Sequence, residues 1–135
     1  MSDLVLLDTD ILSMFFRGHP SVVSRMEEYT KDHEKIYLSI ITYYEILSGL
    51  RHIEATRQIE QFLEFCLFNE ILPITLESAS IAAKHYANLR KLGTPLADMD
   101  LLIAGIAIEN NMTLITHNMK HFSRIPGIKV QDWGE

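Results

Sequence analysis

The sequence predicts an α/β fold with three layers, in which helices cover both faces of a mainly parallel central sheet of four to five strands. Short apolar runs typical of buried strands recur along the chain, and helical segments separate them. This alternation favours a parallel sheet built from strand-helix-strand units. The 135 residues, of which 47% are hydrophobic, suit a single domain spanning residues 1–135 with one substantial core.

The first half of the chain divides at polar residues and helix breakers. Leu4 to Leu7 is an unbroken apolar run and is expected to form a buried strand. The Asp-Thr-Asp that follows can cap a helix running through Ile11 to Phe16, which a glycine and a proline end. The further expected elements are a helix opening at Ser21, a strand at Ile36–Ser39, a helix at Ile40–His52 and a longer amphipathic helix at Glu54–Glu70.

The second half continues the alternation. A third strand is expected at Ile71–Ile74, where the proline suits an edge strand or a strand start. The segment Asp98–Asn111 is almost entirely apolar and predicts a buried helix. The remaining elements are a helix at Glu77–Leu92, a turn at Gly93–Pro95, a fourth strand at Thr113–Thr116 and a fifth strand at Lys129–Val130.

Composition excludes several classes of protein. The formal net charge is −6, from 18 acidic and 12 basic residues, which argues against a broad basic face for nucleic acid. Cys66 is the only cysteine, so no internal disulfide forms, as suits a reducing compartment. No basic residue precedes Arg17, and no apolar run reaches membrane-spanning length. A cytoplasmic protein with no membrane partner is therefore expected.

Acidic and polar residues gather where the predicted strands end. Binding sites of parallel sheets form beyond the carboxyl ends of the strands. Carboxylates that emerge from apolar surroundings and converge repel one another unless a hard cation neutralises them. Oxygen ligands alone favour Mg²⁺ or Mn²⁺ over Zn²⁺, and such ions suit phosphoryl chemistry. The residues expected at this edge are Asp8, Glu45, Asp98, Asp100, Thr116 and Asn118.

Each of these acids also has a purely structural interpretation. Asp8 can serve as a helix N-cap, and Thr42 to Glu45 has the spacing of a capping box. Asp98 can cap the next helix, and Asp100 can interact with its dipole. Taken singly, these interpretations are favoured. Taken together, the positions favour a site, because capping does not require the helices to start at the same edge of a sheet.

Several motifs follow one another in order along nearly the full length of the sequence. They are Leu6–Ser13, Ser39–Gly49, Ala97–Ala104 and Thr116–Phe122, followed by Ile125–Gly127 and Asp132–Trp133. In these segments the sequence resembles the PIN-domain ribonucleases of the VapC toxin type. The resemblance implies that Asp8, Glu45 and Asp100 are the catalytic acids and the metal ligands. It also implies a Mg²⁺- or Mn²⁺-dependent endoribonuclease that cuts structured RNA, often transfer RNA, and leaves a 5′-phosphate and a 3′-hydroxyl.

The last motif departs from the family pattern. Many members carry a fourth acid there, and this chain has Asn118 and His121 in the candidate positions. Asn118 can bind a metal through its carbonyl oxygen or orient a water. His121 can contact phosphate or transfer a proton near neutral pH, or it can be an ordinary surface histidine. Asp98 can supply the missing charge, and we expect a second metal position to be weaker than the first.

The resemblance also suggests contacts with substrate and partners. Thr9 or Ser13 would place a hydroxyl beside the metal, with Thr116 at the same edge. A small cognate antitoxin would lie over the helices near the site, with Ile11–Phe16 and Phe62–Phe68 supplying a groove. A homodimer is expected as well. The basic candidates for the RNA backbone are Arg17, which is the best placed in sequence, and Arg51, Arg90, Lys91, Lys120 and Arg124.

Two other functions compete with this interpretation. Asp8-Thr9-Asp10 after an apolar strand is also typical of haloacid-dehalogenase-like phosphatases. Their motif has Thr or Val where this chain has Leu12, and the chain is short for that fold and its cap. The second alternative is a degenerate PIN domain that only binds RNA or an antitoxin, which the missing fourth acid motivates.

Overall fold

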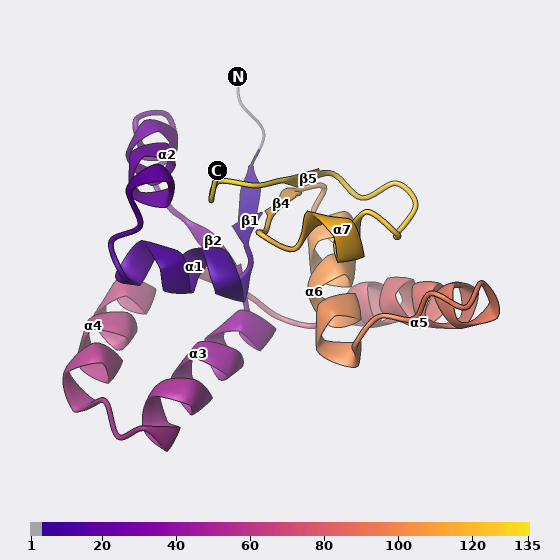
Figure 1. Ribbon diagram of the computed structural model, residues 1–135, viewed down its shortest axis with the longest axis horizontal. Coiled ribbons are helices and arrows are strands. Elements are labelled where there is room, and N and C mark those ends of the chain that lie inside the picture. Colours follow the sequence, from indigo (N-terminus) through magenta and orange to yellow (C-terminus); the bar gives the residue numbers. More distant parts are fainter. Residues whose placement is uncertain (1–3) are drawn as a thin grey trace.

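The computed structural model describes residues 4–135 and shows an α/β fold (Figure 1). Its strands are short, and helices occupy most of the chain between them. The strands are β1 (Val5–Leu7), β2 (Tyr37–Ser39), β3 (Glu70–Leu72), β4 (Thr113–Ile115) and β5 (Val130–Gln131). The helices are α1 (Thr9–Phe16), α2 (Pro20–Thr30), α3 (Ile40–His52), α4 (Thr56–Leu67), α5 (Leu76–Lys91), α6 (Asp98–Glu109) and α7 (Met119–Phe122).

The five strands form one sheet in the order β3-β2-β1-β4-β5, and every pairing is parallel. The strand β1 is central, with Leu6 opposite both Tyr37 of β2 and Leu114 of β4. All five strands therefore end at the same edge. The strand β3 lies at one side of the sheet, so the predicted edge position is confirmed. The predicted bounds Ile71–Ile74 are wrong, because β3 ends at Leu72 and Pro73, which cannot donate to the ladder, follows it.

The sheet separates two hydrophobic clusters, because alternate strand residues point to opposite faces. Leu6 and Leu114 pack with the buried face of α6 and with parts of α5 and α7. Leu7 and Ile115 pack on the other face with residues of α1, α2 and α4. Figure 1 shows the same division, with α1, α2 and α4 on one side and α5, α6 and α7 on the other. The predicted three-layer α/β class is confirmed.

Several predicted boundaries are wrong. The helix expected at Glu54–Glu70 spans only Thr56–Leu67, and Glu70 begins β3. Asn69 explains the early end, because its side-chain amide donates to the Phe65 carbonyl and its side-chain oxygen accepts from the Ile36 backbone N–H. The short helix α7 was not predicted, and the fifth strand begins one residue later than expected. No helix within residues 4–135 is long and apolar enough to span a membrane.

Candidate active site at the carboxyl edge of the sheet

Asp8 lies at the junction of β1 and α1 and is 6% exposed. Its backbone N–H donates to the Ile115 carbonyl at 2.8 Å, so the sheet fixes its position. Its Oδ1 accepts from the Thr9 backbone N–H at 2.8 Å, which makes Asp8 the N-cap of α1. Its Oδ2 accepts from the Thr116 hydroxyl, also at 2.8 Å. The cap expected from the sequence is therefore confirmed, and the same carboxylate stands among other acids.

Burial raises the pKa of Asp8 to about 7, and the charges of Asp10 and then Asp100 act in the same direction. The hydrogen bonds from Thr116 and Thr9 oppose this shift without cancelling it. Without a cation, the carboxyl group of Asp8 is therefore only partly ionised near neutral pH. A positive ion placed among these acids would favour its charged form.

Glu45 faces the same edge from α3. The N-cap of α3 is Ser39, whose hydroxyl accepts from the Thr42 backbone N–H, so the capping-box interpretation of Thr42 and Glu45 is wrong. Glu45 Oε1 instead accepts from the Thr9 hydroxyl at 2.6 Å. The Thr42 hydroxyl lies 3.0 Å from that of Thr9 and must donate to it, because Thr9 has a single hydroxyl proton. Thr9 thus links α1 to α3 and orients Glu45.

Asp100 enters from the first turn of α6. The N-cap residue there is Ala97, and no side chain caps this helix, so the proposed Asp98 cap is wrong. Burial raises the pKa of Asp100, and the charges of Glu45 and Asp10 add to the rise, whereas His121 lowers it. Because the charges of Asp10 and Glu45 act on Asp100, these three acids from α1, α3 and α6 lie near one another. His121 is also close enough to act on Asp100.

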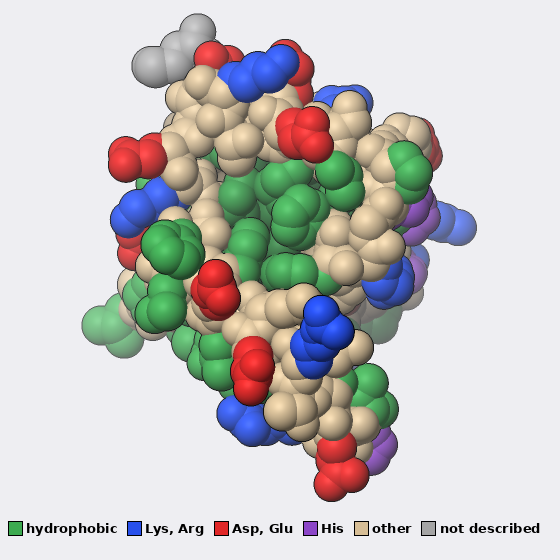
Figure 2. All heavy atoms as spheres, turned by 90° about the vertical axis from the view of Figure 1, so that its left-hand side faces the viewer, with side chains coloured by type: hydrophobic (Ala, Val, Ile, Leu, Met, Phe, Trp, Pro, Cys, Tyr) green, Lys and Arg blue, Asp and Glu red, His purple; other side chains and the backbone are tan. Residues whose placement is uncertain are grey.

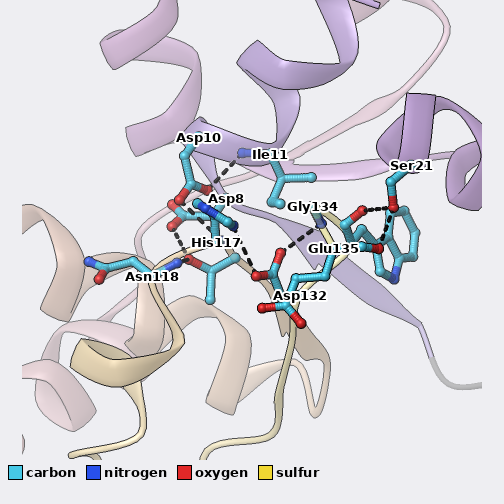
Figure 3. Close-up of polar contacts among 11 residues, drawn as sticks. Asp8, Asp10, Ile11, Ser21, His117, Asn118, Asp132, Gly134 and Glu135 are labelled. Carbon is cyan, nitrogen blue, oxygen red and sulfur yellow. Dashed lines mark hydrogen bonds and ion pairs between the residues drawn. The ribbon is translucent and has the colours of Figure 1, made fainter. Parts of the chain in front are cut away.

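Asp10 also belongs to this group, although it was not among the residues expected at this edge. Its Oδ1 accepts from the Ile11 backbone N–H at 2.7 Å, and its Oδ2 accepts from the His117 backbone N–H at 3.1 Å (Figure 3). Burial raises its pKa, and its charge acts on Asp8 and Asp100. Its spacing of two residues from Asp8, in the first turn of the same helix, was the signal available in the sequence.

Asp98 does not join the acids. It is exposed, and it borders a shallow hollow between α5 and α6 with Tyr86 and Leu101. It is absent from the charges that shift the pKa of Asp8 or Asp100. The structure therefore gives no support to Asp98 as the replacement for a fourth acid. Asp10 lies nearer to Asp8 and Asp100 and is the better candidate for that role.

The remaining predicted residues divide into two groups. Thr116 is fully buried, and its hydroxyl accepts from the Asn118 backbone N–H at 3.0 Å while it donates to Asp8. Ser13 and Arg17 lie elsewhere, around a hollow of about 430 Å³ between α1, α3 and α4. Thr116 and Asn118 thus belong to the acidic edge. Among the described residues, no side-chain hydrogen bond or ion pair links Ser13 or Arg17 to the acids.

The acidic edge matches a divalent cation in donor chemistry. The charges of neighbouring acids help to raise the pKa of Asp8 and of Asp100, and the candidate ligands are all oxygens, which hard cations prefer. Within residues 4–135, no three His, Cys, Asp or Glu side chains are already grouped as a finished metal cage. A bound cation would offset the mutual repulsion of the carboxylates and so favour their closer approach.

Comparison with known proteins identifies the family of this chain. The PIN domain family model matches residues 5–128. Ribonuclease VapC1 of Haemophilus influenzae is 30% identical, over 96% of this chain and 98% of its own length. The tRNA(fMet)-specific endonuclease VapC of Salmonella typhimurium is 27% identical, over 95% of this chain and 96% of its own.

Among solved structures, VapBC2 from Rickettsia felis, bound to a DNA fragment from its promoter, superimposes with a TM-score of 0.86. That match has 29% sequence identity and covers 96% of this chain and 98% of the other. Sequence and fold therefore agree over nearly the whole length, and this chain belongs to the VapC group of the PIN-domain family.

Proposed function

We propose that this chain is a metal-dependent endoribonuclease that hydrolyses phosphodiester bonds in structured RNA, with transfer RNA as the substrate class. The observation that carries the proposal is the convergence of Asp8, Glu45 and Asp100 onto one edge of the sheet, from the β1–α1 junction, α3 and α6. The naming of one relative as a tRNA-specific endonuclease and of others as ribonucleases supports the substrate class.

PIN-domain nucleases generally depend on a divalent metal, and we propose Mg²⁺ or Mn²⁺ here because the donors are all oxygens. Asp8, Glu45 and Asp100 would hold it. When bound, such an ion lowers the pKa of a water and stabilises negative charge on the phosphate oxygens. The chain itself would orient the ligands, since Thr116 fixes one carboxylate oxygen of Asp8 and Thr9 fixes Glu45.

Two further residues would act on the substrate side. His121 is exposed and near enough to Asp100 to influence its pKa, so it can contact a phosphate or carry a proton. Asn118 follows β4 and is tied by its backbone to Thr116, which leaves its amide side chain as a polar group beside the acids. Neither Asn118 nor His121 supplies the negative charge that a fourth carboxylate would bring.

The function is tested on the purified chain, freed of any partner, with total transfer RNA and either Mg²⁺ or Mn²⁺. The wild type is expected to cleave and to leave 5′-phosphate ends. D8N and D100N keep the side-chain shape but lose the charge, and we expect each to lower the cleavage rate by at least about a hundredfold. D98N serves as the matched control and should cleave like the wild type, because Asp98 is exposed and outside the acidic group.

The result separates this proposal from its two competitors. Cleavage that persists in D8N and D100N, or in EDTA, would contradict a metal site built on these acids. Turnover of para-nitrophenyl phosphate without any RNA cleavage would favour the phosphatase alternative. Binding of RNA with no cleavage under either metal would favour a degenerate domain.

We further propose that a small antitoxin controls the enzyme through the helical face that carries α1 and α4. Figure 2 shows hydrophobic side chains gathered in a hollow of the face on the left of Figure 1, where α1, α2 and α4 lie. Aromatic rings of α1 and α4 meet there in edge contacts, for example Phe16 with Phe65 at 5.2 Å between centroids. Phe16 is 40% exposed, which leaves apolar area for an amphipathic partner segment. The expected homodimer stays a prediction.

A further inference from the structure

Asp132 lies after β5, close to the carboxyl terminus, yet its side chain is only 7% exposed. Its Oδ1 accepts from the Gly134 backbone N–H at 2.7 Å, and its Oδ2 lies 2.9 Å from Nδ1 of His117 (Figure 3). A carboxylate can only accept, so the imidazole Nδ1 carries the proton in this contact. Both carboxylate oxygens are thus used, and the ring of His117 is held in one orientation.

His117 connects this pair to the acidic edge. Its backbone N–H donates to Oδ2 of Asp10 at 3.1 Å, and the preceding residue, Thr116, donates to Asp8 at 2.8 Å. Two consecutive residues after β4 therefore contact two of the acids directly. The Thr116 backbone N–H donates to the Gln131 carbonyl at 2.9 Å, and the contact between the His117 ring and Asp132 adds a side-chain link one residue further along both segments.

The end of the chain is anchored independently of this contact. The Ser21 hydroxyl of α2 lies 2.8 Å from the Trp133 carbonyl and 2.6 Å from the Glu135 carbonyl. The Trp133 ring is 4% exposed and packs against Tyr29. Asp132 is consequently not needed to keep the terminus on the molecule, and a burial this deep calls for another explanation.

Gly134 packs tightly over the same pair. A Cβ at this position would lie 3.0 Å from Nδ1 of His117, 3.0 Å from Oδ1 of Asp132 and 2.9 Å from the end of Met14 on α1. The loop, the terminal segment and α1 thus meet with no spare room. The Asp132 side chain is 7% exposed and the His117 side chain 54%, so the pair is enclosed on the Asp132 side and open to solvent on the His117 side.

We propose that Asp132 is a positioning residue for the active site. Through its hydrogen bond with His117 it holds the loop after β4 so that Thr116 and the His117 N–H orient the carboxylates of Asp8 and Asp10. The inference rests on the proposed function, because the acids that it orients are the proposed metal ligands and their neighbour. Residues that orient metal ligands from outside commonly change metal affinity about 10–100-fold when they are removed.

The test is a double-mutant cycle on the full chain, with Mn²⁺ affinity measured by calorimetry. D132A and H117A are each expected to raise the Kd for Mn²⁺ by roughly tenfold, and the double variant is expected to be no worse than either alone. H117N retains a donor near the position of Nδ1 and should recover most of the affinity. Ser21→Ala is the matched control, because it loosens the terminus without touching the pair, and its Kd should equal that of the wild type.

A second readout does not depend on metal or on cleavage. The backbone N–H of His117, which donates to Asp10, should exchange with deuterium faster in D132A than in the wild type or in Ser21→Ala. In cleavage assays, D132A should lower kcat and leave KM for the RNA unchanged, since the proposed role of the pair is to orient the carboxylates and not to bind the RNA.

The outcomes separate this inference from the proposed function. A wild type that neither cleaves RNA nor binds Mn²⁺ would refute the proposed function, while the exchange of the His117 N–H would still report on the pair. Folded D132A with wild-type Mn²⁺ affinity and wild-type exchange would overturn the inference. Equal losses in Ser21→Ala and D132A would also overturn it, because they would assign the effect to the anchoring of the terminus.

Discussion

At the scale of single residues, Asp8 is the N-cap of α1 and also a member of the acidic group, two interpretations that its sequence position offers as alternatives. It caps α1 through one oxygen and accepts from Thr116 through the other, yet burial still raises its pKa to about 7. An ordinary cap lies at the surface and keeps its charge at little cost. Burial thus makes Asp8 a less stabilising N-cap than an exposed aspartate would be. It also leaves a carboxyl group whose ionised form a bound cation would stabilise.

The raised pKa of Asp8 has a consequence for stability. The folded state binds this proton more tightly than the unfolded state, whose pKa is near 3.8. The stabilisation is therefore fully present below pH 3.8 and is lost as the pH rises towards 7, by up to about 4 kcal/mol. In D8N this loss is absent. Without metal, we expect D8N to gain stability relative to the wild type between pH 5 and 7.5, measured by urea unfolding.

The slope with pH, rather than the stability at any one pH, checks this prediction. Asparagine cannot accept hydrogen bonds from both Thr9 and Thr116 as the carboxylate does. The free energy of unfolding of D8N can therefore be offset from that of the wild type by a pH-independent amount, in addition to the pH-dependent difference. D98N, which removes the charge of an exposed side chain, serves as the matched control. Parallel curves for D8N and the wild type would show that Asp8 does not bind its proton more tightly in the folded state.

At the scale of elements, α6 carries Asp100 and packs closely on α5. Gly105 of α6 has no room for a side chain, because a Cβ there would lie 2.4 Å from the Ser78 backbone oxygen. Ser78 in turn belongs to the capping box of α5 with Thr75. The close approach of the two helices thus depends on one glycine, and the position of Asp100 follows from that approach.

We expect Gly105→Ala to destabilise the protein by about 1–3 kcal/mol, because the neighbouring atom is backbone and cannot turn away. The matched control is Gly49→Ala in α3, where nothing lies within 4 Å of the new methyl group. Alanine is the better helix former, so the control should gain up to about 1 kcal/mol. Thermal unfolding of both variants measures the contrast, and a stabilised Gly105→Ala would refute the close packing of α5 and α6.

At the scale of the whole molecule, the sequence suffices for the fold class and for the convergence of Asp8, Glu45 and Asp100. Parallel strands bring residues that are far apart in the chain to one edge, so strand ends alone locate those acids. Asp10 and Asp132 could not be placed in that way. Their roles depend on His117, which lies 107 and 15 residues from them, and on loop geometry that no periodicity encodes. The four-residue helix α7 is too short for a periodic signal.

The net charge of −6 acquires a different meaning once the acids are located. Asp8, Asp10, Glu45 and Asp100 lie at one edge and repel one another and any phosphate that approaches. A cation bound there would reverse the sign of that local interaction. The RNA affinity of the chain should therefore be coupled to metal occupancy, and such a coupling acts equally in both directions.

The direction in which a divalent cation changes the RNA affinity distinguishes this coupling from general screening of charges by salt. Divalent cations that merely compete for phosphates weaken RNA binding, as any added salt does. For the wild type we expect Ca²⁺, with intact RNA verified on gels, to tighten the binding of transfer RNA by about tenfold, measured by fluorescence polarisation. D100N should lose this gain and D98N should retain it. Weaker binding of the wild type on addition of Ca²⁺ would mean that the RNA is held by basic side chains alone and that the acidic edge does not contact its phosphates through a metal.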